Sequence, residues 1–378
     1  MQRVLVLGAG MVGAAMAADL SDRFAVTLAD IDADRLAHLA KNTSLRAVTA
    51  DLRDSGVIGQ LCVEADLVIG AVPGHMGEAA LRAVIDAGRD IVDISFFDEA
   101  AADLDSLNAL ALERGVTAVF DCGVAPGMSN ILLGHHLSEM QVESFACYVG
   151  GLPVERALPW QYKAPFSPVD VLQEYIRPAR LVEHGEVVIR PPMSEPEMVK
   201  FAQVGTLEAC NTDGLRSLLG LPVPHMKEKT MRWPGHYDLV RSLRDSGFLD
   251  TKPISVGEGA VLPLNVTARL LLPLWRLEDG EEEFTAMRVL VTGNQAGRRR
   301  RITWELFDRT TGGVSSMART TGYTATAVAS LALGGTLQLP GLHTPETLGG
   351  QPALLPQILD YLSARGVIYH RTDTSLDN

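Results

Sequence analysis

Cysteine is scarce in this chain of 378 residues, and its four cysteines are scattered rather than paired. Cys62, Cys122, Cys147 and Cys210 form no Cys-x-x-Cys motif, so we interpret them as free cytosolic thiols and not as a disulfide framework or a zinc site. Long hydrophobic runs are lacking too, because no apolar stretch is long enough to span a bilayer. The first residues do not resemble a secretory signal. We therefore expect a soluble, cytoplasmic protein with no membrane partner.

Positive charge is also in short supply, with 33 lysines and arginines against 46 aspartates and glutamates and a net charge of −13. This balance argues against nucleic acid as a partner. The one basic run, Arg298 to Arg301, is expected at the solvated end of a hairpin, with a phosphate or partner site as the alternative. No cluster of histidine, aspartate and glutamate has the spacing of metal ligands, so we expect no bound metal. A Gly-x-Ser-x-Gly elbow is also absent.

The most informative stretch is a glycine-rich turn near the start of the chain. The apolar run Val4–Leu7 has the length of a strand, and a glycine motif and an alanine-rich helical segment follow it. In such a unit the first glycine permits the tight turn, the second lets the backbone approach a pyrophosphate, and the third lets helix and strand pack closely. The pattern predicts a dinucleotide with its phosphates at the helix N-terminus; a turn that only packs the layer is the alternative. The cofactor-binding residues expected here are Gly8, Ala9, Gly10, Met11, Val12 and Gly13.

Asp30 ends the second apolar run and indicates which dinucleotide is bound. A carboxylate at this position accepts hydrogen bonds from the adenosine ribose and repels a 2′-phosphate. No arginine follows it directly, so we predict NAD rather than NADP. A helix N-cap is the alternative role, although Asp32 is better placed to cap the helix that runs to Lys41.

Residues just beyond other predicted strands complete the expected cofactor site. The fourth strand should end at the switch point of the sheet, where ligands lie beyond the carboxyl ends of the strands. A buried strand that ends in a plain turn is the alternative there, and Asp51 could equally be a turn aspartate. The residues assigned to the cofactor in these positions are Asp51, Leu52, Ala71, Val72, Pro73, Val124 and Pro126.

Short apolar runs alternate with helical segments over the first third of the chain. This alternation is typical of an α/β domain with a Rossmann-type, doubly wound parallel sheet. The segment Gly123–Asn130 is too rich in glycine and proline for the interior of an element, so we place a domain boundary there and expect an NAD-binding domain over residues 1–125. The six predicted strands cover residues 3–7, 25–29, 46–49, 67–72, 90–94 and 116–120.

After this boundary the pattern changes to that of an α+β domain, expected over residues 126–320 for substrate binding and dimerisation. Its sheet is predicted to be open and largely antiparallel, so one face must be covered by helices or by a second subunit. We therefore expect a homo-oligomer, a dimer or larger. The elements expected in this domain are a helix at Ser129–Met140, a strand at Ser144–Val149, a hairpin of Met287–Thr292 with Ile302–Phe307, and a third strand at Gly313–Ala318.

Residues 321–378 are expected to form a C-terminal helical segment that packs back on the first domain. Thr320–Leu333 reads as a helix of small residues, capped by Thr320 or Thr321, and Leu354–Ala364 reads as a final amphipathic helix. Dinucleotide-binding folds often borrow such late elements, so one of these helices should complete the NAD-binding domain.

Several blocks of the sequence together resemble the saccharopine dehydrogenase superfamily, in the same order and over nearly the whole chain. Within it the L-lysine 6-dehydrogenase branch is the most similar. The resemblance implies that the ε-carbon of L-lysine, or of a close ω-amino acid, is oxidised with NAD; the imine then hydrolyses to the semialdehyde and ammonia, and the aldehyde cyclises to a piperideine carboxylate. The blocks are Leu7–Gly13, Leu28–Asp32, Asp121–Leu132, Tyr148–Pro153 and Met317–Tyr323.

Three further positions bear on the choice of branch. Saccharopine reductases of this superfamily carry an acidic residue where this chain has Ala125, which favours the lysine branch. However, the segment 162–167 resembles their Tyr-Lys-Phe-Ser motif, and Asn211-Thr212-Asp213 resembles their Asn-Arg-Asp motif. A saccharopine-type NAD(P)-dependent imine reductase is therefore the alternative, and a non-catalytic NAD(H)-binding protein is a third reading.

Oxidation of lysine needs a base or a desolvating pocket, because an ε-ammonium with a pKa of about 10.4 cannot lose hydride while it is protonated. Asp121 and Asp93, at strand ends, are candidates for the base, with a structural cap as the alternative for each. Lys163 is a candidate if burial lowers its pKa, against a solvated lysine or a carboxylate anchor. His236 titrates in the right range, against a plain helix-start residue.

The two ends of an amino acid need complementary charges. Arg232 and Arg319 are candidates for the substrate carboxylate, with Arg216 third, and a surface salt bridge is the alternative for each. Asn211 and Asp213 are candidates for the α-ammonium, and a capping segment before a helix at Leu215 is an equal alternative.

Aromatic residues gather in the proline-punctuated segment 154–200, which includes Trp160, Tyr162, Phe166 and Tyr175. Loops with aromatic side chains commonly line pockets. We therefore assign Tyr162 to the substrate-binding site.

Overall fold

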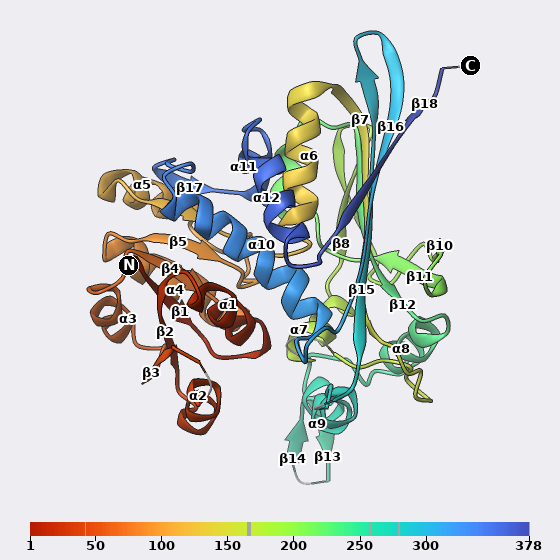
Figure 1. Cartoon of the computed structure of the whole chain (residues 1–378). Coiled ribbons are helices and arrows are strands. Elements are labelled where there is room, and N and C mark those ends of the chain that lie inside the picture. The colour runs from red at the N-terminus through yellow and green to blue at the C-terminus, as the bar shows by residue number, and fades with distance from the viewer. Residues whose placement is uncertain (42, 165–167, 258, 279, 378) are drawn as a thin grey trace. The chain divides into compact units, whose positions relative to one another are not determined.

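The computed structural model describes residues 1–41, 43–164, 168–257, 259–278 and 280–377. The chain divides into two compact units, which Figure 1 displays from red to blue along the sequence. Unit 1 comprises Met1–Glu139 and Ala318–Ile368, and unit 2 comprises Met140–Met317 and Tyr369–Asn378. Unit 1 runs beyond residue 125 because α6 (Met128–Glu139) packs beside α11 (Pro345–Gly349) within the same unit.

Unit 1 is built on a parallel sheet in the order β17-β6-β5-β4-β1-β2-β3. The doubly wound architecture and six of the strands are confirmed. The strand at the β17 edge has only three residues, and no apolar run announces it. The strands are β1 (Arg3–Leu7), β2 (Ala25–Asp30), β3 (Arg46–Thr49), β4 (Leu67–Gly70), β5 (Asp90–Asp93), β6 (Thr117–Val119) and β17 (Gly341–His343).

Crossover helices connect these strands, and three of them begin at an aspartate. The side chain of Asp32 accepts the N–H of Arg35 and caps its helix, as predicted. Asp54 and Asp103 cap two further helices in the same way. These helices are α1 (Met11–Ser21), α2 (Ala33–Ala40), α3 (Ser55–Cys62), α4 (Gly74–Asp86) and α5 (Leu104–Arg114).

Two late helices, α10 (Ser316–Leu333) and α12 (Leu354–Ser363), return to unit 1 from the far end of the sequence. They meet α1 at the half-buried carboxylate of Asp19. This group accepts hydrogen bonds from the hydroxyls of Thr326 and Tyr361, at 2.6 Å each, and pairs with Arg365. The borrowed elements are therefore tied to the first helix by a buried polar network as well as by apolar packing.

Unit 2 contains a nine-stranded mixed sheet along the path β10-β11-β12-β7-β15-β16-β18, with β8 paired to both β12 and β9. The β7 and β12 pair is parallel and the other pairs are antiparallel. The strands are β7 (Gln141–Pro153), β8 (Ala179–Glu183), β9 (Glu186–Arg190), β10 (Glu197–Phe201), β11 (Gly205–Asn211), β12 (His225–Arg232), β15 (Glu283–Gln295), β16 (Arg298–Arg309) and β18 (Tyr369–Ser375).

The remaining elements of unit 2 lie between these strands in the sequence. A short hairpin of two strands stands apart from the large sheet. The elements are α7 (Pro168–Glu174), the 3-10 helix η1 (Arg216–Gly220), α8 (His236–Asp245), β13 (Ile254–Val256), β14 (Gly259–Val261) and α9 (Pro263–Trp275).

Three predictions in this region are corrected. The third strand at Gly313–Ala318 is wrong, because α10 already begins at Ser316 and the side chain of Glu283 accepts the N–H of Met317 there. Thr320 and Thr321 consequently lie inside the helix and do not cap it. The C-terminal segment is not purely helical, since β18 pairs with β16 in the sheet of unit 2.

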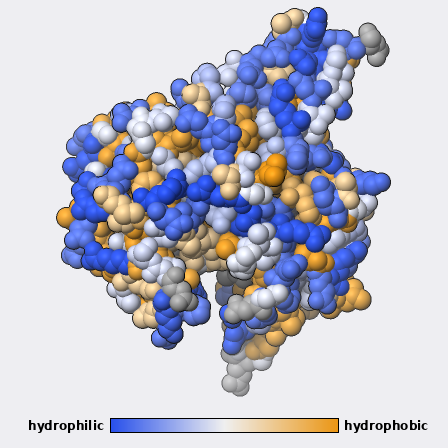
Figure 2. All heavy atoms as spheres, in the orientation of Figure 1, coloured by the Kyte–Doolittle hydropathy of each residue, from blue (hydrophilic) through white to orange (hydrophobic). Residues whose placement is uncertain are grey.

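Hydrophobic side chains reach the surface of unit 2 on α9 and on the hairpin β13–β14. Figure 2 shows hydrophobic residues at the surface in the part of unit 2 that carries α9. No helix among the described residues is both long and apolar enough to cross a bilayer. The exposed residues of this apolar patch are Ile254, Val256, Val261, Val266, Leu270 and Leu274.

Candidate functional site

The glycine turn after β1 has the geometry that the motif predicts. Gly8 has a left-handed backbone with φ of 107°, and a Cβ at this position would lie 2.5 Å from the carbonyl oxygen of Ala71. A Cβ on Gly13 would lie 2.0 Å from the carbonyl oxygen of Gly8. Both contacts are far inside the van der Waals limit, so only glycine allows β1, the end of β4 and α1 to approach this closely.

The N-terminus of α1 is suited to an anion. Its N-cap, Gly10, offers no side chain, and the first turn carries no acidic residue, whereas α2, α3 and α5 each have an aspartate cap. A Cβ on Gly10 would meet no atom within 4 Å, so open space lies in front of this turn. Unsatisfied N–H groups at a helix start attract a phosphate. Met11 and Val12 belong to the same first turn.

Asp30 lies at the end of β2 beside this turn. The N–H of Ala9 donates to Oδ2 of Asp30 at 2.6 Å, and the N–H of Asp32 donates to Oδ1 at 2.9 Å. The carboxylate is thus fixed against the glycine turn and is only half-buried. Because each carboxylate oxygen has a further acceptor site, Asp30 can still accept hydroxyl groups of a ribose.

Residues assigned to the adenine end have other partners. Asp51 accepts hydrogen bonds from Nε and Nη2 of Arg53 at 2.8 and 2.6 Å, and these bonds lower the pKa of Asp51 to about 2. Leu52 is buried in the core of unit 1. Asp51 would therefore have to share or give up its ion pair with Arg53 to bind the adenosine of a dinucleotide.

The fourth strand leads directly to the glycine turn. Ala71 follows β4, and its Cβ is within 3.3 Å of the position that a Gly13 Cβ would take. Val72 is buried, and the exposed Pro73 is the N-cap of α4 without a side-chain hydrogen bond. These residues flank the same turn as the glycines.

Two buried aspartates follow neighbouring strands in unit 1. Asp93 ends β5, and its Oδ2 accepts the N–H of Ser95 at 3.1 Å and the hydroxyl of Ser95. Asp121 follows β6 and has a left-handed backbone with φ of 56°. Burial first, and then the charges of Asp93 and Asp121, raise the pKa of the Cys122 thiol far above its usual range. Two carboxylates thus follow neighbouring strands at the carboxyl edge of the sheet, and both act on the same thiol.

The turn after Asp121 folds back on itself. The N–H of Gly123 donates to the carbonyl oxygens of Asp121 and Pro126, at 3.0 and 3.1 Å, and Val124 is buried. This compact turn follows directly on Asp121 at the start of α6.

Unit 2 contains a cluster of polar and aromatic side chains, called here the unit 2 cluster, around the buried side chain of Arg232 in β12. Its Nη2 donates to Glu174 at 2.9 Å and its Nε to the hydroxyl of Tyr175 at 3.1 Å. Its guanidinium carbon lies 4.6 Å from the centre of the Tyr162 ring, a cation–π contact. Arg232 is therefore fully paired inside unit 2, and a substrate carboxylate would have to compete with Glu174 for it.

His236 belongs to the same cluster and is uncharged. Burial and the charge of Arg232 lower its pKa to about 3. Its Nδ1 lies 2.8 Å from the carbonyl oxygen of Trp160, so this nitrogen carries the proton, and Nε2 accepts the hydroxyl of Tyr175 at 2.9 Å. The lone pair that a general base needs is thus engaged. His236 also begins α8, as the alternative reading held.

The other predicted site residues are engaged elsewhere. Lys163 donates to the carbonyl oxygen of Arg276 at 3.0 Å and pairs with Glu281 at 3.2 Å. Asp213 is held by two nitrogens of Arg180 at 2.8 and 2.9 Å. Arg319 lies in unit 1, where it donates to the carbonyl oxygen of Arg365 at 2.9 Å. Each of these three charged groups would have to leave a partner within the fold before it could bind a substrate or take its proton.

Asn211 and Arg216 are buried on either side of the loop that follows β11. The amide nitrogen of Asn211 donates to Ser194 and Glu195, at 3.2 and 3.0 Å. Arg216 has a φ of 48° and is the first residue of η1, a five-residue 3-10 helix that stands where a helix was predicted at Leu215. The part of the Tyr-Lys-Phe-Ser-like block at 165–167 lies outside the described residues.

Several members of the unit 2 cluster were not predicted as site residues. Glu228, Thr230 and Arg232 alternate along β12 and so share one face of the sheet, which the spacing of residues in a strand could have indicated. Glu174 and Tyr175 come from α7 and the residue after it, about 55 residues earlier in the chain, and no local pattern connects them to β12.

The buried carboxyl group of Glu283, the first residue of β15 in unit 2, makes the stability of the fold depend on pH. Burial raises its pKa to about 7, from an ordinary value of 4.5. A raised acid pKa stabilises the fold fully below pH 4.5, and this stabilisation is lost as the pH rises to about 7. We expect Glu283→Gln to be more stable than the wild type at pH 8 by up to about 3 kcal/mol. Urea unfolding at pH 4.5 and pH 8 gives the free energy of unfolding of both proteins. If the two proteins differed by the same free energy at both pH values, the prediction would be contradicted.

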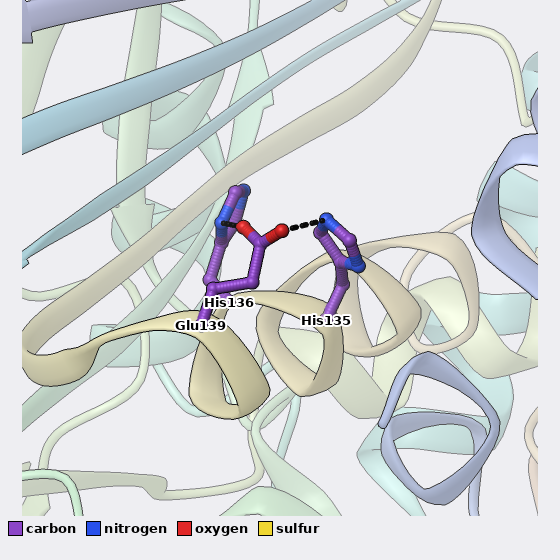
Figure 3. A group of neighbouring side chains, drawn as sticks. All are labelled: His135, His136 and Glu139. Carbon is purple, nitrogen blue, oxygen red and sulfur yellow. Dashed lines mark ion pairs between the residues drawn. The ribbon is translucent and has the colours of Figure 1, made fainter. Parts of the chain in front are cut away.

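One group of side chains in unit 1 lies within reach of a common metal ion. His135, His136 and Glu139, on the last turns of α6, place one ligand atom each within 4.8 Å of one another (Figure 3). The prediction that no cluster of histidine, aspartate and glutamate has the spacing of metal ligands is wrong here, because positions i, i+1 and i+4 of a helix bring these three side chains together. Figure 3 shows the carboxylate between the two rings, with Nε2 of His135 at 3.3 Å and Nδ1 of His136 at 3.5 Å. Glu139 thus already pairs with both rings.

Comparison with known families covers nearly the whole chain. A profile described as the saccharopine dehydrogenase NADP binding domain matches residues 4–119, and one described as the saccharopine dehydrogenase C-terminal domain matches residues 123–367. The two matched ranges follow one another along the chain, since the first ends at residue 119 and the second begins at residue 123.

Two curated relatives show how the similarity is distributed. The mitochondrial α-aminoadipic semialdehyde synthase of Rattus norvegicus is 27% identical over 197 residues, which are 50% of this chain but only 21% of the relative. The chain thus matches about a fifth of the first such relatives. The saccharopine dehydrogenase [NADP(+), L-glutamate-forming] of Saccharomyces cerevisiae is 23% identical over 449 aligned positions that cover 99% of each chain.

Solved structures show the same fold. Apo saccharopine dehydrogenase (L-Glu forming) from Saccharomyces cerevisiae superimposes with a TM-score of 0.81 at 21% identity, over 99% of this chain and 100% of that one. Homospermidine synthase from Legionella pneumophila, in complex with NAD, superimposes with a TM-score of 0.67 at 14% identity, over 99% and 91%.

Proposed function

The chain belongs to the saccharopine dehydrogenase family, and we propose that it is an NAD-dependent oxidoreductase that oxidises the ε-carbon of L-lysine, or of a close ω-amino acid. The product semialdehyde would then cyclise to a piperideine carboxylate. The observation that best supports an NAD-dependent oxidoreductase is the N-terminus of α1, which follows the glycine turn, has no side-chain cap and faces open space. Asp30 is fixed beside it. The family's relatives include enzymes named for saccharopine and for aminoadipic semialdehyde, which supports a lysine-related substrate.

Ala125 and Thr212 favour lysine over saccharopine. Saccharopine reductases resemble this chain around both positions but carry an acidic residue where it has Ala125 and an arginine where it has Thr212. Without that arginine the chain has one cation fewer for the additional carboxylates of saccharopine. The saccharopine-type imine reductase remains the second candidate, and the near full-length similarity to the Saccharomyces cerevisiae saccharopine dehydrogenase is the observation that favours it.

The proposed reaction needs a hydride acceptor, a proton acceptor and water. NAD would supply the hydride acceptor. The residues must take one proton from the ε-ammonium, because only the neutral amine can release hydride from the adjacent carbon. Asp93 and Asp121 are the proposed acceptors of this proton, since both are buried carboxylates at the carboxyl ends of β5 and β6, on the sheet edge that carries the glycine turn. Water then releases ammonia from the imine.

The choice between NAD and NADP is expected to depend on Asp30. Its carboxylate would repel a 2′-phosphate, so Asp30→Ala should raise the ratio of kcat/KM for NADP to that for NAD by at least about tenfold. The matched control is Asp34→Ala, which removes the same charge from an exposed site on α2. Steady-state kinetics with both cofactors measure the ratio. An unchanged ratio in Asp30→Ala would contradict the assignment.

The test of the function is direct. The purified protein is incubated with NAD and a panel of amino acids, and NADH is followed by its absorbance. We expect turnover with L-lysine and none with saccharopine. Turnover with saccharopine alone would select the imine reductase, and cofactor-induced thermal stabilisation without turnover on any amine would select the non-catalytic reading.

We also propose a homo-oligomeric assembly and a cytoplasmic location. The apolar patch on α9 and β13–β14 supports a homo-oligomer, because burial of such a surface stabilises association. A cytoplasmic location is consistent with four buried free cysteines. Light scattering that gives the mass of a monomer would contradict the assembly.

A further inference from the structure

Glu228 is a carboxylate buried in unit 2 on the same face of β12 as Arg232. Glu228 is only 5% exposed. The backbone of Gly214 approaches it so closely that a Cβ there would lie 2.5 Å from Oε2 of Glu228. The glycine after the Asn211-Thr212-Asp213 block therefore makes room for this carboxylate.

Two hydroxyl groups orient Glu228. Thr212 Oγ1 donates to Oε2 of Glu228 at 2.6 Å, and the same Oγ1 accepts the N–H of Thr230 at 3.0 Å. Since the one hydroxyl hydrogen of Thr212 points to the carboxylate, the hydroxyl of Thr230, 2.7 Å away, donates to Thr212. The chain of donors ends on Glu228, an arrangement that holds the carboxylate in one position.

The charges around Glu228 do not balance. Glu174 on α7 is paired with Arg232 at 2.9 Å, and Asp213 is paired with Arg180 at 2.8 Å. Among the described residues no lysine or arginine forms an ion pair with Glu228. Burial above all, and then the charges of Glu174 and Asp213, raise the pKa of Glu228 to about 8, although Thr212 and Arg232 act in the opposite direction. Glu228 is therefore mostly protonated at pH 7, and its ionised form needs a cation that the described residues do not supply.

An independent feature of the same cluster also lacks a partner. The hydroxyl of Tyr162 is buried and has no hydrogen-bond partner among the described residues. Its pKa is raised by burial, while Arg232 and Glu174 act on it as they act on Glu228. A buried donor without a partner is costly. This hydroxyl belongs to the same cluster, since the Tyr162 ring stacks on the guanidinium of Arg232.

Resting on the proposed function, we propose that Glu228 is the carboxylate that binds the α-ammonium group of the amino acid substrate. The reacting ε-amine must be neutral, so only the α-ammonium can be held as a cation. Asp213, which the sequence suggested for this role, is paired with Arg180. Asn211, the other suggested residue, donates from its amide nitrogen to Ser194 and Glu195, while its buried Oδ1 has no hydrogen-bond partner among the described residues and stays available as a neutral acceptor. Glu228 is a positioning and specificity residue that selects amino acids with a free α-ammonium, and its proton passes to solvent when that cation binds.

Calorimetry of L-lysine binding to the protein saturated with NADH tests this, because no hydride acceptor is then present and the substrate binds without reacting. We compare the wild type with Glu228→Gln at pH 7 in buffers of different ionisation enthalpy. The wild type should release about 0.9 proton more than the variant, the fraction of Glu228 protonated at that pH. The variant should bind L-lysine about 10- to 100-fold more weakly. In turnover its KM should rise by the same factor with kcat within about threefold.

Two controls accompany the experiment. Glu143→Gln removes a carboxylate from a half-exposed position of the same sheet, where it pairs with Arg299, and should bind like the wild type. The ligand 6-aminohexanoate, which lacks the α-ammonium, should bind the wild type and Glu228→Gln with equal affinity. Far-UV circular dichroism and an unchanged affinity for NADH verify that the variant is folded.

The outcomes separate the two proposals. If the wild type oxidises L-lysine and Glu228→Gln matches it in affinity and proton release, the role of Glu228 is overturned while the function stands. If L-lysine binds with the expected proton release but is never oxidised, the function fails and Glu228 keeps its role. Absence of L-lysine binding to the wild type would overturn both.

Discussion

Gly13→Ala should abolish cofactor binding and weaken the fold. A Cβ at this position would lie 2.0 Å from the carbonyl oxygen of Gly8 and 3.3 Å from the Cβ of Ala71, so α1 must move away from β1. Such overpacking costs about 2–3 kcal/mol. The displaced helix start no longer presents its N–H groups to the phosphates, so the affinity for NADH should fall by at least about 100-fold. Urea unfolding and NADH fluorescence titration measure the two effects.

Two other glycines provide controls that separate fold from binding. Gly10→Ala places its methyl group in open space and at an ordinary φ of −64°, so the fold should be unaffected while the pyrophosphate loses its close approach. Gly59→Ala in α3 also meets no atom within 4 Å and should gain about 0.5–1 kcal/mol without any change in binding. If Gly13→Ala bound NADH as the wild type does, the turn would not be the phosphate site.

Arg232→Met should cost about 3–5 kcal/mol of folding free energy. Arg232 is 1% exposed, and its guanidinium donates to Glu174, the hydroxyl of Tyr175 and the carbonyl oxygen of Met231. Methionine fills much of the volume but supplies no charge, so Glu174 loses its cation and Tyr175 loses a donor. The lysine activity should fall with the fold, because α7 is anchored to β12 through this residue.

The matched control for Arg232 is an exposed arginine of the same unit. Arg299 pairs with Glu143 while 57% of its side chain is exposed, so Arg299→Met should cost less than about 1 kcal/mol. Both variants are compared by urea unfolding at pH 7. A cost for Arg232→Met within about 1 kcal/mol of that control would mean that the cluster does not stabilise unit 2.

Much of unit 1 could be predicted from sequence because its signals are local. The strands β1 to β6 are apolar runs, and Gly8, Gly13 and Asp32 act through neighbours in the same βα unit. β17 escaped prediction because three residues carry no periodicity. The end of β7 was missed for another reason. Gly150 looks like a breaker, yet it lies inside the sheet where a Cβ would be 2.5 Å from the carbonyl oxygen of Met231.

The chemistry of unit 2 was harder to predict because charges choose partners across long sequence distances. Nothing around Asp213 indicates that Arg180 occupies it, and nothing around Lys163 points to Glu281. Arg232 and Tyr162 were singled out and do share a cluster, but Glu174 and Glu228 complete it without any motif. The environment that neutralises His236 likewise depends on packing by α7 and α9, which no local pattern encodes.

The central claim is that hydride leaves the ε-carbon of lysine for NAD. The most direct measurement uses L-lysine deuterated at carbon 6 and, separately, at carbon 2, with mass spectrometry of the reduced cofactor. The account predicts one deuterium in the cofactor from the carbon 6 label and none from the carbon 2 label. Deuterium from carbon 2, or no reduced cofactor with either substrate, would contradict it.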